Sequence, residues 1–468
     1  MRFRPERAAA LAFALARLAF CWYRALRQSI TIDEAYTYTR FLSGSWNDIY
    51  AQYDANNHVL YSILAKFSIE HLGLSELSLR LPSLIAGFFL TLGIFELLRL
   101  CTRSVAVRWL ALVALSLHPL LLDFSIAARG YGMALAFLVW AMFFAMRRGY
   151  FASGAMTGFA LSANLTAAFP VAGLFAAMLL LDPVSLKDRL RNFAVMLAPA
   201  ETIFLAICFG ALRTAEGRDF YVGFPNLGKS IDQLIEVSFL ATRRSGLIGS
   251  ERLRHFFEFP VLPLILVFIV AAAVFSLKDR KDRLRLFSIV MLVLTACAVL
   301  GAHFFLNVLY PVDRTGLYLL LLFGIAWASA TELVPKLRSA NLVLALIVSL
   351  QFATQLHTNY FTLWQDGSRI KDTVAILRKL SAGRPAGSVK ISTSWYHQSA
   401  VEFYRERWHI AEWAPVVRNE PTKFTGYDFY VLKDEDPQAI RESGMRILFR
   451  DPRTDLTVGM NWPAGMRP

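Results

Sequence analysis

Apolar segments alternate with short polar segments along the first three quarters of the chain. Runs of about 17 to 22 apolar residues, the length of a helix that crosses a bilayer, recur before residue 358. We expect eleven such helices near residues 8–26, 82–100, 105–122, 131–146, 150–165, 167–181, 192–212, 260–277, 286–303, 316–333 and 341–357. The pattern predicts an all-α polytopic membrane domain over residues 1–357.

The pattern changes after residue 357. The stretches SVKIST, DFYVLK and RILFR are typical of strands, and IKDTVAILRKL and HQSAVEFYRERW are typical of helices. We therefore expect residues 358–468 to form a small soluble α/β domain, large enough to hold its own core.

Composition agrees with a membrane protein. The chain has 468 residues, of which 56% are hydrophobic and 18% charged, and its mean hydropathy is +0.44. A soluble protein of this size cannot bury so much apolar surface, so lipid must cover part of it. The four cysteines lie in or beside apolar segments, without disulfide-type or metal-type spacing: Cys21, Cys101, Cys208 and Cys297.

Charge distribution predicts the orientation in the membrane. With the N-terminus inside, the inside segments carry 18 Lys and Arg residues, whereas the short outside turns carry only Arg129 and Arg314. The net charge of +14 is thereby explained by membrane topology, and we expect no nucleic-acid partner. The inside segments are 1–7, 99–108, 147–149, 182–191, 277–285 and 334–340.

Three long polar stretches then lie outside: 27–81, 213–259 and 358–468. The first two alternate short apolar runs with charges, as interfacial amphipathic helices do. The N-terminus itself resembles a signal peptide, but Arg17 interrupts its apolar run and no convincing cleavage site follows. We expect an uncleaved anchor, with a cleaved leader as the alternative.

The first outer stretch contains two adjacent acids in SITIDEAYTYTRF. Neighbours on a helix point about 100° apart, so Asp33 can face a cleft while Glu34 braces it, or the reverse. The alternative is an ordinary helix start with Thr31 as N-cap and both acids in a first turn that favours negative charge.

A second polar group precedes an apolar run in YDANNHVLYSILAKF. Asn57 and His58 could lie near a phosphate or an acceptor hydroxyl. The alternative is that the Asx residues cap the next helix and His58 fills its first turn.

Two outside turns carry charges at membrane depth. In LLDFSIAARGYGMALAF, Asp123 and Arg129 surround a turn beside Tyr131, and an ion pair between the two charges is the alternative to a functional role. In YPVDRTGLYLLLL, Arg314 lies at a helix start, where the dipole disfavours a cation unless an anion is also bound. The alternative is a side chain that reaches the lipid headgroups.

These residues share a location. Asp33, His58, Asp123, Arg129 and Arg314 all fall on the outer face in a topology derived from other residues. Their convergence predicts a polar cleft at the outer boundary of the membrane.

The chain also resembles the GT-C superfamily of integral-membrane glycosyltransferases, in particular the protein O-mannosyltransferase, aminoarabinose transferase and lipopolysaccharide-core transferase branches. The resemblance lies in short stretches in a common order. They are the acidic pair at 33–34, NHVLY at 57–61, LSLRLPSLIAG at 77–87, AARGYG at 127–132 and YPVDRTGLY at 310–318.

Two departures concern the site. Where the family usually has Glu in the second outer turn, this chain has Ala127, so a second carboxylate there would have to be Asp123. The family's Pro-Pro after His is replaced by Val59 and Leu60. Both weaken the expectation of a metal: a divalent ion is possible but not supported, and no other cofactor is expected.

The resemblance implies a polyprenyl-phosphate sugar donor, used on the outer face of a bacterial inner membrane within the cell envelope. The acceptor would be a hydroxyl on a glycan, lipid or protein. Asp33 would be the base of an inverting transfer, with Glu34 orienting the acceptor or bracing the loop. Arg129 and Arg314 would bind the phosphate.

Other residues would line the cleft: Asn57, His58, Asp123 and Tyr131. One alternative is a flippase or transporter of lipid-linked sugars, which would place charges near the bilayer midplane. The second alternative is a non-catalytic scaffold whose outer domain binds a partner.

The topology can be tested with a reporter enzyme that is active only outside the membrane. Fusion after residue 468 is expected to give activity, and fusion after residue 285, in the basic run, is expected to give none. The reverse result would place the N-terminus outside and remove the predicted outer cleft.

Overall fold

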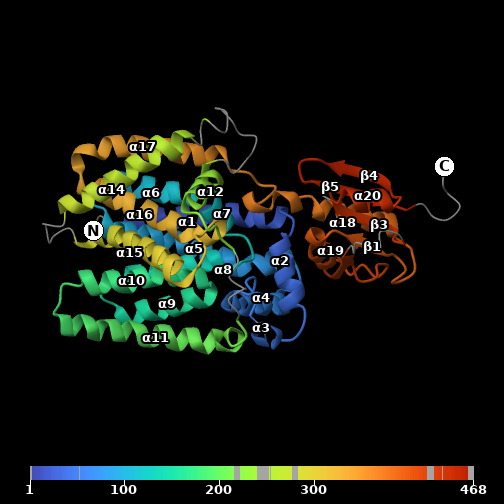
Figure 1. Cartoon of the computed structure of the whole chain (residues 1–468), viewed down its shortest axis with the longest axis horizontal. Helices are drawn as coiled ribbons and strands as arrows, with labels where there is room; N and C mark the ends of the chain where they lie inside the picture. Colours follow the sequence, from blue (N-terminus) through green and yellow to red (C-terminus); the bar gives the residue numbers. More distant parts are fainter. Residues whose placement is uncertain are drawn as a thin grey trace. The chain divides into compact units, whose positions relative to one another are not determined.

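The computed structural model describes residues 3–51, 53–215, 222–239, 252, 255–276, 283–418, 426–434 and 436–461 (Figure 1). The chain forms two compact units. The first consists of Met1–Tyr23, Tyr50–Ala65 and Arg80–His357, and the second of Arg24–Ile49, Lys66–Leu79 and Thr358–Pro468.

Each of the eleven predicted spans contains an apolar helix. They are α1 (Phe3–Arg27), α5 (Glu76–Cys101), α6 (Val105–Leu117), α8 (Gly130–Met146), α9 (Tyr150–Ala163), α10 (Ala168–Leu181), α11 (Leu186–Leu212), α14 (Leu262–Ser276), α15 (Arg283–Leu306), α16 (Leu317–Leu333) and α17 (Arg338–Thr354). Within the described residues, seven helical stretches are long and apolar enough to cross a membrane, and further apolar helices are shorter.

The span predicted at 105–122 is wrong in one respect, because it is two helices. Helix α6 ends at Leu117, and α7 (Pro119–Asp123) begins after a break at His118. Proline lacks an N–H and disfavours the helical region for the residue before it, and His118 has ψ of 123°.

The predicted division between the spans 150–165 and 167–181 is confirmed. Helix α9 ends at Asn164, which is extended (φ −163°, ψ 129°). A short 3₁₀ turn, η2 (Leu165–Ala167), follows before α10, and Asn164 Oδ1 accepts a hydrogen bond of 2.8 Å from the Thr166 amide. An Asx side chain caps this turn, as is common where a helix begins.

Small residues let the helices of the first unit approach closely. Helices α9, α10 and α11 run roughly parallel (Figure 1), and Gly154 on α9 meets α11. A Cβ atom at Gly154 would lie only 2.0 Å from the carbonyl oxygen of Met196. Such backbone contact supplies the van der Waals packing that holds helices together in lipid.

The first two stretches predicted to lie outside, 27–81 and 213–259, contain short helices within their described residues. The first forms α2 (Ile32–Thr37), the π-helical η1 (Tyr38–Leu42), α3 (Asp48–Ala51) and α4 (Val59–Leu72), and the second forms α12 (Leu227–Phe239). Helix α12 is amphipathic and buries Ser230, Leu234, Ile235 and Ser238. Residues 216–221, 240–251 and 253–254 of the second stretch, and 277–282 of the basic run, lie outside the described residues.

The second unit contains a five-stranded mixed sheet. Its order is β2-β1-β3-β5-β4, with β1 parallel to β2 and β3, and β5 antiparallel to β3 and β4. The strands are β1 (Ile391–Thr393), β2 (Val417–Arg418), β3 (Phe429–Lys433), β4 (Arg446–Asp451) and β5 (Leu456–Met460). Its helices include α18 (Ile370–Ser381), α19 (Trp395–Arg407) and α20 (Pro437–Glu442).

The three predicted strands and two predicted helices of this part are confirmed as β1, β3, β4, α18 and α19. Strand β3 is fully buried in the middle of the sheet, as its continuous apolar run indicates. The elements β2, β5 and α20 were not predicted, since β2 has two residues and α20 only six. The second unit also extends beyond residues 358–468, because segments of the first outer stretch belong to it.

Candidate active site

The acidic pair lies at the start of α2 in the second unit. The Thr31 hydroxyl accepts a hydrogen bond of 3.2 Å from the Glu34 amide, and Glu34 Oε2 accepts one of 2.9 Å from the Thr31 amide. This reciprocal capping box confirms Thr31 as the N-cap. Glu34 is 0% exposed, so its carboxylate braces the helix start.

Asp33 differs from its neighbour in exposure. Asp33 is partly exposed, although its Oδ2 atom is enclosed, and its carbonyl oxygen accepts a 2.9 Å hydrogen bond from the Thr37 hydroxyl. Both carboxylates lie in the first turn of α2, where the positive end of the helix dipole favours negative charge. The two acids are therefore placed differently, one enclosed and one partly open.

In the first unit, His58 is the centre of a buried polar cluster. Its Nδ1 lies 3.1 Å from Asn164 Nδ2, so Nδ1 accepts this hydrogen bond. Its ring packs edge-to-face against Tyr131, with centroids 4.9 Å apart. Among the described residues, Nε2 of His58 has no hydrogen-bond partner.

His58 lies close enough to two arginines from distant parts of the chain to feel their charges. Burial, followed by the positive charges of Arg129 and Arg314, holds the pKa of His58 well below its ordinary value of 6.5. The imidazole is therefore neutral at physiological pH. Two arginines 185 positions apart thus act on one ring.

Arg129 is fixed by the first outer stretch and by α5. Its guanidinium donates to Asn56 Oδ1 at 2.8 Å and to the Asn56 carbonyl at 3.3 Å. The Ser83 hydroxyl donates to the Ala127 carbonyl at 2.6 Å and thereby holds the turn that carries Arg129. Arg129 is buried and is the N-cap residue of α8.

Arg314 lies in a 3₁₀ turn, η6 (Asp313–Gly316), directly before α16. Helix α12 holds this turn, because Gln233 Oε1 accepts a 2.8 Å hydrogen bond from the Asp313 amide and the Gln233 amide donates to the Asp313 carboxylate. Arg314 and Tyr131 line one small cavity, together with Thr166.

Gly130 allows the close contact on which the cluster depends. A Cβ atom there would lie 1.9 Å from the Ala163 carbonyl oxygen and 2.8 Å from His58 Cβ. Because the first contact is with backbone, no side-chain rearrangement could relieve it.

The other two predicted residues have structural contacts. Asn57 is buried, and its Oδ1 accepts a 2.9 Å hydrogen bond from the Ser62 hydroxyl at the start of α4. Asp123 is buried at the end of α7, and its carbonyl accepts from the Ala127 amide at 2.8 Å. The structure thus brings His58, Arg129, Tyr131 and Arg314 together, and it describes Asp33 and Glu34 within the second unit.

Three members of the cluster were not predicted: Ser83, Asn164 and Thr166. Asn164 and Thr166 interrupt an apolar run, which was read only as a boundary between spans. Ser83 belongs to the RLPS stretch, and nothing local indicates that its hydroxyl would reach Ala127, 44 positions away.

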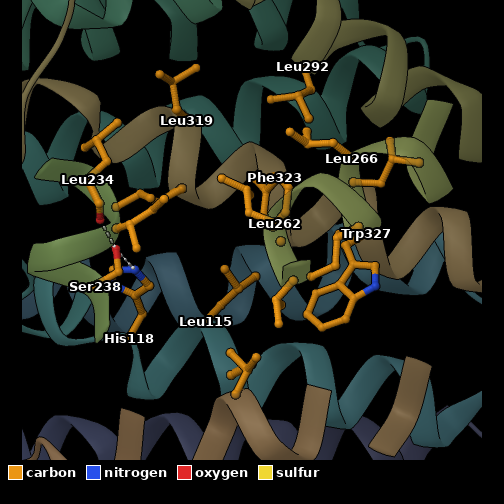
Figure 2. Close-up of a pocket in the computed structure, with 18 of the residues that line it drawn as sticks. Leu115, His118, Leu234, Ser238, Leu262, Leu266, Leu292, Leu319, Phe323 and Trp327 are labelled. Carbon is orange, nitrogen blue, oxygen red and sulfur yellow. Dashed lines mark hydrogen bonds between the residues drawn. The ribbon is translucent and has the colours of Figure 1, made fainter. Parts of the chain in front are cut away.

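A large apolar cavity lies between α6, α12, α14, α15, α16 and α17 (Figure 2). Its volume is about 480 Å³, and its walls include Leu115, Leu262, Phe323 and Trp327. Its few polar groups include His118 Nε2, which lies 3.1 Å from the Ser238 hydroxyl.

The same helix lines both spaces. Arg314, just before α16, and Tyr318 on it line the small cavity beside Tyr131, whereas Leu319 and Phe323 line the apolar cavity. Helix α16 therefore has a polar beginning beside the cluster and an apolar side along the cavity. Among the described residues, no three His, Cys, Asp or Glu side chains come together as metal ligands would.

Comparison with solved structures decides the fold. ArnT from Cupriavidus metallidurans, bound to undecaprenyl phosphate, matches with a TM-score of 0.57 and 14% identity, over 98% of this chain and 99% of that one. The Archaeoglobus fulgidus oligosaccharyltransferase, in complex with Zn and sulfate, matches with a TM-score of 0.50 and 15% identity, over 91% of this chain and 68% of that one. The chain has the GT-C fold.

The resemblance seen in the short sequence stretches is therefore confirmed at the level of the fold, and the chain is a multi-pass membrane protein. No protein-family model and no curated protein sequence matches it.

The contact at Gly130 can be tested by Gly130→Ala. The added methyl group clashes with backbone, so we expect a loss of about 1–3 kcal/mol, measured as a fall in the unfolding temperature in detergent. Gly301→Ala is the matched control, because a Cβ atom there meets nothing within 4 Å. Equal stability of the two variants would contradict the close approach.

The lowered pKa of His58 predicts a pH dependence of stability. Between the low pKa of the folded state and about 6.5, the unfolded chain binds more protons, so stability is lost as pH falls below about 6.5. In His58→Gln this slope is expected to decrease by up to about 1.4 kcal/mol per pH unit.

The measurement is the unfolding temperature between pH 8 and pH 5. The exposed His71 is the control, and His71→Gln is expected to keep the wild-type slope. A His58→Gln protein with that same slope would show that His58 is not held neutral.

Proposed function

We propose that this protein is a membrane glycosyltransferase that moves a sugar from a polyprenyl-phosphate donor to an acceptor hydroxyl at the outer face of the membrane. The observation that supports this most is the cluster in a GT-C fold, in which the His58 ring packs on Tyr131, Tyr131 and Arg314 line one small cavity, and Arg129 is held by Asn56. Ionisable side chains in a membrane protein commonly mark ligand sites, and arginine is suited to phosphate.

The anion in this proposal is the donor phosphate. Guanidinium groups match phosphate oxygens with forked hydrogen bonds and keep their charge at any working pH. Arg314 precedes α16, where the helix dipole disfavours a lone cation and favours a bound anion. ArnT, which has this fold, is bound to undecaprenyl phosphate.

The apolar cavity suits the isoprenoid chain of the same donor. It shares α16 with the arginine-bearing cluster, and its lining is almost entirely aliphatic and aromatic (Figure 2). An amphipathic ligand could place its phosphate at Arg314 and its hydrocarbon along Leu319 and Phe323. The free energy for holding the chain would come from apolar burial.

Asp33 is the proposed base. The acceptor oxygen forms a bond to the anomeric carbon, its proton passes to the Asp33 carboxylate, and the bond from that carbon to the phosphate oxygen breaks with its electrons on the phosphate. Attack opposite to the leaving group inverts the configuration. The partly exposed position of Asp33 supports this role, whereas the enclosed Glu34 suits bracing of the loop.

His58 and Tyr131 would line the sugar or acceptor side of the site. Because His58 is neutral and its Nδ1 accepts from Asn164, its Nε2 carries the proton and can donate a hydrogen bond to a ligand oxygen. We propose Asn57 and Asp123 as supports of the same region, since their contacts lie within it.

The transporter alternative is less well supported. Its main signal would be charges deep in the membrane, and two such charges within apolar helices, Arg17 on α1 and Glu96 on α5, have structural partners. Arg17 donates to the Ser125 hydroxyl at 2.9 Å, and Glu96 binds Arg7 at 2.8 Å and Arg99 at 2.6 Å. Such contacts hold helices together and need no transported ligand.

The proposed setting is a bacterial inner membrane, with the N-terminus in the cytoplasm and residues 358–468 outside. Glycan, lipid and protein acceptors all supply the required hydroxyl, so the assay below includes each class. A chelator arm tests the use of a divalent metal.

The deciding experiment incubates the purified protein with labelled polyprenyl-phosphate sugars and each class of acceptor, with and without a chelator. Asp33→Asn is expected to lower transfer about 10²–10⁴-fold, because the base is lost, and to leave donor binding within a few-fold. Asp48→Asn removes a charge from the same outer stretch and is the control. If the wild type transfers sugar and Asp33→Asn is equally active, Asp33 is not the base. If the wild type transfers sugar from none of the donors, the proposed function is wrong.

A further inference from the structure

The start of α2 is held by side chains from the C-terminal part of the second unit. The Ile30 amide donates a 2.9 Å hydrogen bond to Tyr404 Oη, and Tyr404 Oη donates to Glu76 Oε1 at 3.0 Å. Ile30 directly precedes the N-cap, so this bond fixes the backbone three residues before Asp33. Tyr404 lies on α19 and is 0% exposed.

Glu76 is itself the centre of a buried charge network. It is 2% exposed, lies 3.1 Å from Lys371 Nζ, and pairs with the Arg407 guanidinium. Removing a partner of this network leaves the buried Glu76 carboxylate with less compensation for its charge. The network therefore determines where Tyr404 Oη lies.

A second contact holds the other end of α2. Tyr38 Oη donates a 2.6 Å hydrogen bond to Glu406 Oε2, and the Tyr38 ring packs edge-to-face on Phe403. Burial and this carboxylate raise the pKa of Tyr38, so its hydroxyl stays protonated and keeps donating. The contacts from α19 come from Phe403, Tyr404, Glu406 and Arg407, whose spacing places them along one side of the helix.

The segment that leads into α2 is fixed as well. The Ser29 hydroxyl donates to the Ser368 carbonyl at 2.8 Å and accepts from the Lys371 amide at 3.2 Å. The Gln28 amide donates to the Tyr360 carbonyl at 2.6 Å. The chain on both sides of Asp33 is thus tied to residues beyond position 357.

We propose that α19 and Glu76 form a positioning platform for the acid-bearing turn of α2, so that the C-terminal domain acts in catalysis by holding Asp33. This inference rests on the proposed function in taking Asp33 as the base. Tyr404, Glu76 and Arg407 are positioning residues, and they act on the reaction only through α2.

The physical reason is the sensitivity of proton transfer to geometry. Loss of the Tyr404 hydroxyl leaves the buried Ile30 amide without its acceptor and lets the start of α2 move. A displacement of about 1 Å at a reacting group can cost about 10²-fold in rate. Binding of the donor phosphate, assigned to Arg129 and Arg314, does not depend on this bond.

The test compares Tyr404→Phe with Tyr430→Phe in the full-length protein. Both remove one hydroxyl from a buried tyrosine of the same unit, and Tyr430 Oη contacts Asn461 in the sheet. In Tyr404→Phe we expect kcat to fall about 10–10²-fold, with the donor KM changed less than about 3-fold. In Tyr430→Phe both constants are expected to stay within about 3-fold of wild type.

A double variant separates positioning from general destabilisation. In an Asp33→Asn background, Tyr404→Phe is expected to lower the residual rate no further, because it acts only through Asp33. A loss in that background as large as in the wild type would show that Tyr404 supports the fold generally, and would overturn the proposal.

Amide hydrogen exchange supplies a readout that needs no activity. Exchange at residues 29–37 is expected to be faster in Tyr404→Phe than in both the wild type and Tyr430→Phe. Equal exchange rates at residues 29–37 in Tyr404→Phe and Tyr430→Phe would show that α19 does not hold α2, and the proposal would be wrong. If the wild type transfers no sugar, the proposed function and with it the catalytic role fail, while the exchange result still decides whether α19 holds α2.

Discussion

The polar cluster depends on the close approach of two backbones at Gly130. With the Ala163 carbonyl oxygen 1.9 Å from where a Cβ atom would be, α8 can begin directly against the end of α9. That contact brings Tyr131 onto the His58 ring and places Asn164, one residue beyond Ala163, at His58 Nδ1. Glycine is the one residue that permits it, because the opposing atom is backbone and cannot rotate away. The turn that carries Arg129 follows from the same contact.

The charged side chains of the first unit lie among apolar helices, and this setting determines their contacts. Ionised groups within a membrane protein need partners, and the structure supplies them at Arg17 and Glu96 through bonds between helices. Arg129 and Arg314 both act on the His58 imidazole, whose pKa is lowered first by burial and then by these two charges. The cluster thus places Arg314 directly before α16, the helix that also lines the apolar cavity. A lipid phosphate has a negative charge that matches the arginines and a hydrocarbon chain that matches the apolar cavity. This complementarity is the reason for the proposed donor.

The second unit stabilises a helix that is too short to be stable by itself. A six-residue helix such as α2 has little stability of its own, since nucleation of a helix is unfavourable. Its capping box satisfies the first amides, and Tyr404, Glu406 and Glu76 provide the tertiary contacts that fix its direction. The domain thus contributes rigidity to a short element, as catalytic groups require from their surroundings.

The sequence by itself determined what depends on neighbouring residues. Hydropathy located the eleven apolar spans, apart from the break at His118, the N-cap at Thr31 followed from local chemistry, and short strand-like stretches predicted β1, β3 and β4. Contacts between distant residues could not be read in this way. Asn164 meets His58 across 106 positions and Tyr404 meets Ile30 across 374, and a local pattern carries no information about either pairing. The inclusion of residues 24–49 in the second unit was decided by the same long-range packing. Local sequence sets helix and strand because backbone hydrogen bonds and side-chain periodicity are short-range, whereas a site is assembled only when the folded chain brings helix ends together.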